Sequence, residues 1–189
     1  MAAPAAPPEP AWTGLVLAGG RSSRMGRDKA MLPWRGRPLL QHMIELLAEA
    51  GATTVLVSGD YPAYAGIADT LPGRGPLAGL SSAAAQLDDG PLLVVPVDMP
   101  CLSPSLLRRL ISAPAAPGVC FEGQVLPLRL QLDARSRACL AQLLSCGAAQ
   151  RSLRALQSTL GFHSLPAPAQ LLPGLRNCNT PGQWQELAV

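Results

Sequence analysis

The chain has 189 residues, of which 48% are hydrophobic and only 14% are charged, so it can form an apolar core and is not disordered as a whole. Its 15 basic and 12 acidic residues leave a net charge of +3, and aromatic residues make up 4%, which argues against a nucleic-acid-binding protein. The five cysteines contain no C-x-x-C pair, which favours reduced thiols in the cytoplasm over a disulfide framework or a metal cluster.

We expect residues 1–12 to be a disordered tail rich in proline and alanine, because a regular pattern begins only at Thr13. The tail lacks the basic and apolar segments of an export signal, and no run of about 18 apolar residues occurs, so we expect neither export nor a membrane span. No long linker divides residues 13–189, which predicts a single domain there.

The first predicted elements are a strand and a helix. Gly14–Leu17 is a short apolar run that ends at a glycine pair, which is typical of a buried strand entering a loop. A helix is predicted between Pro38 and Gly51, because apolar residues recur there at helical spacing. These residues are Leu39, Leu40, Met43, Ile44 and Leu47.

Strands and helices continue to alternate along the chain. The apolar runs Val55–Val57 and Leu92–Val97 predict two strands, and the alanine-rich segment 76–87 between them predicts a helix that begins with proline. Ser103 and Pro104 are typical of the start of a helix, here ending at Ile111. The alternation predicts the α/β class, with a mostly parallel sheet between two helical layers in a Rossmann-like α/β/α arrangement.

The pattern changes after Pro117. Residues 119–121 and 125–132 flank a Glu-Gly turn and predict an antiparallel hairpin. Residues 133–146 then predict a helix, and a Thr-Pro pair predicts a last helix after residue 180. His42 and His163 have no acid or nucleophile spaced around them, so we expect both to be structural or solvated.

The stretch from Leu17 to Lys29 combines a strand end, three glycines and four cationic side chains. Glycines let a backbone approach phosphates closely, and the cations can neutralise a triphosphate. The stretch is not a P-loop, because Arg27 and Asp28 stand where Lys-Ser/Thr is required, and Arg21 stands where a dinucleotide fingerprint needs glycine. We therefore expect a polyphosphate-binding loop of another kind.

Asp98 follows the predicted strand 92–97, and ligands bind α/β sheets at the carboxyl ends of parallel strands. A carboxylate buried alone is costly, so Asp98 must reach solvent, accept hydrogen bonds or hold a cation. Magnesium needs only one or two carboxylates beside substrate phosphates and waters. We expect Asp98 to hold Mg²⁺, with a capping role before the helix at Pro104 as the alternative.

Four motifs, in this order along the chain, carry a resemblance to a known family. They are Leu17-Ala-Gly-Gly-x-Ser-x-Arg-Met-Gly-x-Asp-Lys-Ala30, Gly75-Pro-Leu-Ala-Gly79, Val97-Asp-Met-Pro100 and Asn177-x-Asn-Thr-Pro181. From Gly14 to about Leu187 the sequence resembles the molybdenum cofactor guanylyltransferases, which are MobA-type nucleotidyltransferases. The Gly-Gly pair and the Asp28-Lys29 pair favour the guanylyl branch over the cytidylyl branch.

The resemblance implies a nucleotidyltransferase fold and an Mg²⁺-dependent enzyme that transfers GMP from GTP to molybdenum-bearing molybdopterin and releases pyrophosphate. It implies catalytic roles for Arg24, Lys29 and Asp98, with Asp98 also the metal ligand. The residues that match the family's GTP contacts are Leu17, Ala18, Gly19, Lys29, Ser58, Asp69 and Asp98. Ser58 stands where the family commonly carries Asn, which leaves a backbone contact as the alternative there.

Other positions bear on the second substrate. Leu126 stands where the family often carries His, and the segment 150–154 resembles an Arg-bearing segment that meets the molybdopterin, with a solvated helix turn as the alternative. On the assumption that Asn177 and Asn179 point in different directions, we expect only one to face the site and prefer Asn179 as an accessory metal or phosphate contact. The bystander thiol Cys101 is expected to play no part in the reaction.

Two alternative functions remain open from the sequence. One is a related transferase that uses CTP with molybdopterin, or another nucleotide with a sugar phosphate. The other is a non-catalytic nucleotide-binding partner protein, which would release no pyrophosphate in the presence of Mg²⁺. We expect no nucleic-acid or membrane partner, and the resemblance is compatible with transient contacts to proteins that insert molybdenum or mature molybdoenzymes.

Overall fold

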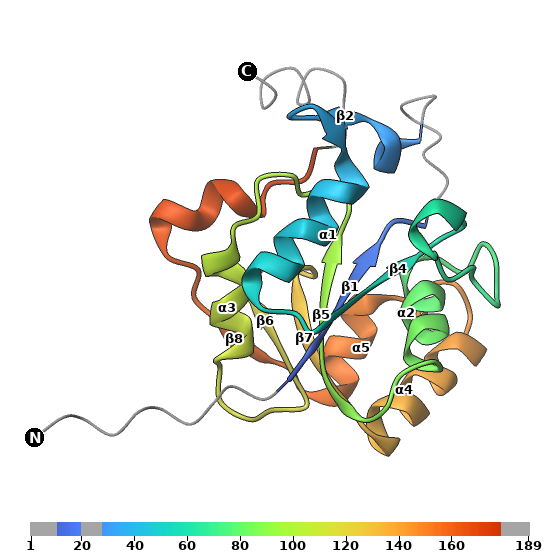
Figure 1. The fold of residues 1–189 in the computed structure, drawn as a ribbon. Coiled ribbons are helices and arrows are strands. Elements are labelled where there is room, and N and C mark those ends of the chain that lie inside the picture. Colours follow the sequence, from blue (N-terminus) through green and yellow to red (C-terminus); the bar gives the residue numbers. More distant parts are fainter. Residues whose placement is uncertain (1–10, 20–27, 179–189) are drawn as a thin grey trace, which may run out of the picture.

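Helices cover both faces of a twisted central sheet in the computed structural model of the chain (Figure 1). The structure describes residues 11–19 and 28–178. Most of the predicted tail and the predicted last helix lie outside these residues. No helix in the described ranges is long and apolar enough to cross a membrane.

In the described part of the chain, the central sheet has six strands in the order β4-β1-β5-β7-β6-β8. Their bounds are β1 Thr13–Leu17, β4 Thr54–Ser58, β5 Gly90–Pro96, β6 Gly118–Phe121, β7 Leu128–Leu132 and β8 His163–Leu165. Strands β4, β1 and β5 are parallel to one another, β8 is parallel to β6, and β7 is antiparallel to both of its neighbours. This arrangement confirms the α/β class, the mostly parallel sheet and the antiparallel hairpin.

Two layers of helices enclose the sheet. Helices α1 (Leu39–Ala50) and α3 (Pro104–Ile111) pack together on one face, and α2 (Pro76–Ala84), α4 (Ala134–Ser145) and α5 (Leu153–Leu160) lie on the other (Figure 1). Alternate residues of β1 serve the two cores: Val16 packs beneath α1 and α3, whereas Leu15 and Leu17 pack beneath the other layer. Both faces of the sheet are therefore apolar, as expected for a parallel sheet.

The short elements are η1 (Lys29–Met31), β2 (Pro33–Trp34), β3 (Arg37–Pro38), η2 (Pro62–Tyr64) and η3 (Ala169–Leu175). Strands β2 and β3 pair as a small antiparallel hairpin that the sequence patterns did not predict. Helix α5 was not predicted either, because only eight residues separate Ser152, which caps its start, from Gly161 at its end. Its apolar face, which includes Leu156, packs into the core beneath α2 and α4.

Local sequence signals set several element ends. Helix α1 ends at Gly51, which adopts a φ of 111° and donates its N–H to the carbonyl of Ala48. The Ser103 hydroxyl accepts from the N–H of Leu106 and starts α3 as predicted. The strand predicted over 125–132 begins only at Leu128, since Pro127 has no N–H to give to the sheet.

The register aligns the ends of three parallel strands. Leu17 of β1 lies opposite Ser58 of β4 and Pro96 of β5, so three parallel strands end at one level of the sheet. Beyond them, the Val97 N–H donates to the Leu17 carbonyl over 3.1 Å. The residues that follow, Ala18 and Asp98, are thereby placed at the same edge.

Candidate functional site

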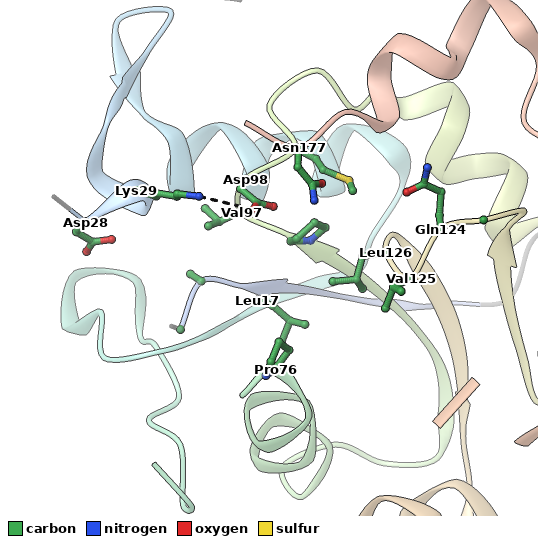
Figure 2. Close-up of a pocket in the computed structure, with 15 residues that line it drawn as sticks. Leu17, Asp28, Lys29, Pro76, Val97, Asp98, Gln124, Val125, Leu126 and Asn177 are labelled. Atoms are coloured by element: carbon green, nitrogen blue, oxygen red, sulfur yellow. Dashed lines mark ion pairs between the residues drawn. The ribbon is translucent and has the colours of Figure 1, made fainter. Parts of the chain in front are cut away.

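A pocket of about 440 Å³ opens at the carboxyl ends of β1 and β5. Its floor is formed by the last residues of these strands and the residues that follow them. One side is formed by Asp28, Lys29 and the start of α2, and the other by the loop between β6 and β7 together with Asn177 (Figure 2). A pocket at this edge of a parallel sheet is where α/β proteins bind ligands.

Lys29 and Asp98 face each other in the pocket, with 3.9 Å between Lys29 Nζ and Asp98 Oδ2 (Figure 2). Their side chains are 19% and 24% exposed, so both charges are partly removed from water. Burial raises the pKa of Asp98 above its usual range, and the Lys29 charge and the Asp98 backbone N–H oppose that shift. The carboxylate thus lies where another cation would stabilise it further.

The oxygen donors beside Lys29 fit magnesium. The Asp98 carbonyl accepts from the N–H of Cys178 over 2.7 Å, which brings the Asn177 side chain next to the Asp98 carboxylate (Figure 2). Within residues 11–19 and 28–178, no cluster of three His, Cys, Asp or Glu side chains could hold a metal ion. A carboxylate and an amide oxygen match the hard-donor preference of Mg²⁺, provided that substrate phosphates and waters supply the remaining ligands.

The backbone after β1 is held by β4. The N–H groups of Ala18 and Gly19 both donate to the Ser58 carbonyl, over 3.0 and 2.8 Å. These two N–H groups are therefore already used in holding β1 to β4. The Ser58 backbone therefore holds the end of β1, whereas a backbone contact between Ser58 and the nucleotide stays a prediction.

Ser58 and Asp69 do not line the pocket but lie together against α2. A side chain at Gly79 would collide with the Ser58 hydroxyl, and its Cβ would lie 3.2 Å from Asp69 Oδ1. Among the described residues, that oxygen is buried and has no hydrogen-bond partner. Burial raises the pKa of Asp69, and the neighbouring Ser58 hydroxyl opposes the shift.

Tyr61 contacts two residues that line the pocket, and the sequence patterns did not indicate this role for Tyr61. Its hydroxyl oxygen lies 2.9 Å from Asp28 Oδ1 and 3.2 Å from the Ala18 carbonyl oxygen. Asp28 Oδ1 also accepts from the N–H of Ala30 over 3.0 Å and so caps η1, where Lys29 is the first residue. Because 33 residues separate Tyr61 from Asp28, no local sequence signal could have revealed the contact.

The loop between β6 and β7 forms the far wall of the pocket, with Gln124, Val125 and Leu126 as lining residues (Figure 2). The Gln157 amide of α5 donates to the carbonyl oxygens of Val125 and Gln124, over 3.0 and 3.4 Å. An element missed in the sequence thus holds one wall of the pocket.

Several other candidate residues can now be placed. Arg24 and Asn179 lie outside the described residues. Asn177 lines the pocket. The assumption that Asn177 and Asn179 point in different directions was wrong, because residues two positions apart in an extended chain point to the same side. Arg154 is exposed on α5 and does not line the pocket.

The histidines and Cys101 also have positions in the structure. The Nε2 atom of His42 lies 3.0 Å from the Pro100 carbonyl oxygen, and burial lowers the pKa of this histidine, as expected for a structural residue. His163 is exposed on β8. Cys101 is half-buried and does not line the pocket.

Comparisons with known proteins identify relatives of this chain. The family model described as a MobA-like NTP transferase domain matches residues 14–164. A molybdenum cofactor guanylyltransferase from Xanthomonas euvesicatoria is 54% identical over 177 residues, covering 93% of this chain and 94% of that protein. A protein of the same description from Ectopseudomonas mendocina is 36% identical, covering 88% and 87%. The solved structure of molybdopterin-guanine dinucleotide biosynthesis protein A from Archaeoglobus fulgidus shares the fold, with a TM-score of 0.73, 19% identity, and coverage of 93% of this chain and 96% of that chain.

Proposed function

Because the chain belongs to the MobA-like NTP transferase family, we propose that it is a molybdenum cofactor guanylyltransferase that transfers GMP from GTP to molybdenum-bearing molybdopterin. The observation that carries this proposal is the Lys29–Asp98 pair, at the end of a pocket that joins β1 and α2 on one side to the β6–β7 loop on the other. The side near β1 and α2 carries the Lys29 and Asp98 charges, which suit the phosphates of a nucleotide. The side near the β6–β7 loop leaves room for the substrate that accepts GMP.

The proposed reaction joins a phosphate oxygen of the acceptor to the α-phosphorus of GTP. The bond between that phosphorus and the oxygen bridging to the β-phosphate breaks, and its electron pair leaves with pyrophosphate. Since the acceptor phosphate is already an anion, no general base is required, and no histidine lines the pocket in the described part of the chain. Catalysis then depends on positioning and on neutralising charge.

Lys29 would stabilise the β- and γ-phosphate oxygens as negative charge moves onto them. Its ammonium is close to Asp98 and points into the pocket (Figure 2), which supports this role. Arg24 remains a prediction for a second cation at the triphosphate. Leu17, Ala18 and Gly19 would bind the nucleotide through backbone and apolar atoms. The GTP contacts expected of Ser58 and Asp69 remain predictions, because neither residue lines the pocket.

Asp98 would hold Mg²⁺, with Asn177 as an accessory ligand. When bound, the ion would neutralise phosphate charge and polarise the α-phosphoryl group. The partly buried carboxylate with a raised pKa supports this proposal, because a divalent cation would offset the cost of its burial.

We test the proposed function by supplying Mg²⁺ with each nucleoside triphosphate and either molybdenum-molybdopterin or a panel of sugar phosphates, and by measuring the pyrophosphate released. We expect release with GTP and molybdenum-molybdopterin only. Release with CTP would assign the chain to the cytidylyl branch, and release with a sugar phosphate would assign it to the sugar-nucleotide enzymes. GTP binding without any release would support the non-catalytic alternative.

We also propose a cellular compartment and a class of protein partners for this enzyme. The five cysteines are all free thiols in the structure, which supports an enzyme of the reducing cytoplasm. Transient contacts with proteins that insert molybdenum or mature molybdoenzymes would deliver one substrate and remove the product.

A further inference from the structure

We propose that Tyr61 is a positioning residue that holds Lys29 in place for the nucleotide polyphosphate, acting through its hydroxyl contacts with Asp28 and Ala18. The inference rests on the proposed function, because it concerns the same nucleotide site. Tyr61 itself does not line the pocket, so it does not act by touching the substrate.

The geometry links Tyr61 to Lys29 in two steps. The Tyr61 hydroxyl donates to Asp28 Oδ1 over 2.9 Å, and the same oxygen accepts from the Ala30 N–H over 3.0 Å. Asp28 is thereby fixed as the cap of η1, and this short helix begins with Lys29. A capping side chain sets where the first helical residue lies, so the hydroxyl bears on the direction of the Lys29 side chain.

The second contact fixes Tyr61 to the end of β1. Its hydroxyl oxygen lies 3.2 Å from the Ala18 carbonyl oxygen, whereas Ala18 donates its own N–H to β4. One hydroxyl therefore sits between the end of β1 and the start of η1, both of which line the pocket. Asp98 follows the neighbouring strand, so the distance between Lys29 and Asp98 depends on this connection.

The chain around Tyr61 is folded so that its ring has little freedom. Gly59 adopts a φ of 129°, and a Cβ added there would lie 2.7 Å from the Tyr61 ring. The Gly66 N–H donates to the Tyr61 carbonyl over 3.0 Å, and a Cβ at Gly66 would lie 2.9 Å from the Tyr61 backbone nitrogen. Two glycines thus allow a close loop that places the ring beside β1.

The hydroxyl stays a hydrogen-bond donor throughout the range in which enzymes are assayed. Burial and the neighbouring Asp28 carboxylate both raise the pKa of Tyr61 well above its usual value. A protonated phenol beside a carboxylate is a stable donor–acceptor pair.

The chain offers a matched control for the test. Tyr64 lies three residues away, is half-buried like Tyr61 and packs against the same core, but its hydroxyl forms no hydrogen bond in the described residues. Tyr61→Phe and Tyr64→Phe each remove one hydroxyl and leave the ring. Only Tyr61→Phe should change the binding of nucleotides.

We measure GTP and GMP binding by calorimetry for the wild type and both variants. We expect Tyr61→Phe to weaken GTP binding about fivefold and GMP binding by less than about twofold, the size expected for one lost hydrogen bond that acts on the polyphosphate end. Tyr64→Phe should bind both nucleotides as the wild type does. A Tyr61→Phe variant that matches Tyr64→Phe, or that loses GTP and GMP equally, overturns the inference.

A double-variant cycle separates positioning from general packing. If Tyr61 acts through Lys29, Tyr61→Phe should have no further effect on GTP binding in a Lys29→Ala background, whereas additive losses would refute the link. A wild type that binds no GTP would instead refute the proposed function.

Discussion

Replacing Asp98 with asparagine should remove activity while making the metal-free protein slightly more stable. Burial raises the pKa of Asp98, so keeping this carboxylate ionised in the folded state costs free energy of folding, and Lys29 offsets only part of that cost. Asparagine has nearly the same shape and keeps an oxygen that can accept the backbone N–H of residue 98. The charge that the proposed reaction would use is therefore a charge that the fold disfavours.

The loss of activity in Asp98→Asn should be much larger than its gain in stability. Turnover should fall at least about 100-fold, the usual loss when a charge that stabilises a transition state is removed. Replacing a functional residue that destabilises the folded state typically adds about 1 kcal/mol to the free energy of unfolding. For a domain of this length, that change raises the melting temperature by about 2–4 °C.

Thermal unfolding with a chelator and without nucleotide measures the stability, and pyrophosphate release measures the activity. Below the ordinary carboxyl pKa of 3.8 the two proteins should unfold alike, because Asp98 is protonated in both the folded and unfolded states. As pH rises through the raised pKa of the folded state, the wild type should lose stability relative to Asp98→Asn, and the gap should then stay constant. Asp88→Asn, at an exposed residue near the opposite end of β5, is the control and should change neither property. A lower melting temperature for Asp98→Asn at neutral pH would show that the Lys29 attraction outweighs burial and would refute the reasoning.

Three further changes test other parts of the structure. Lys29→Ala should weaken GTP binding more than GMP binding in calorimetry, since its partner is the polyphosphate, and equal losses would contradict that assignment. Gly14→Ala should lower the free energy of unfolding in urea by about 1–3 kcal/mol, because its Cβ would lie 3.0 Å from the Leu47 side chain in a filled core, and an unchanged midpoint would contradict that packing. Gln157→Met should raise the KM for the acceptor at least about threefold with little change in the KM for GTP, because it removes the hydrogen bonds that hold the β6–β7 loop. The control Gln131→Met removes an amide that is remote from the pocket and bonded to the Leu132 carbonyl, and it should change neither KM.

The parts of the fold that could be predicted were those set by local chemistry. Ser103 and Pro104 specify the start of α3 whatever surrounds them, and Gly51 ends α1 because its φ of 111° suits glycine. Helix α2 ends at Ala84 rather than at Leu87, since an alanine-rich pattern says little about where such a helix stops. Short elements such as β2 and α5 were missed because they depend on their packing partners more than on periodicity.

The same distinction applies to the site. Lys29 and Asp98 could be proposed because each follows a recognisable motif and the ends of parallel strands meet at one edge. Tyr61 and Gln157 could not, since each acts by a hydrogen bond to a residue more than 30 positions away. Their own sequence neighbourhoods contain nothing that indicates the contact.

The direction of β7 brings a second wall to the pocket, where the proposed reaction would place its second substrate. In the antiparallel register, Leu128 at the start of β7 lies opposite Val94 near the carboxyl end of β5. The loop that precedes β7 therefore reaches the same edge as the loops that follow β1 and β5, whereas a parallel β7 would have its preceding loop at the opposite edge. Asp98 follows β5, the strand between the two halves, so a cation there would lie between the nucleotide side and the acceptor side. The proposed reaction joins two phosphates, and this placement would favour it because charge would be neutralised where the two substrates meet.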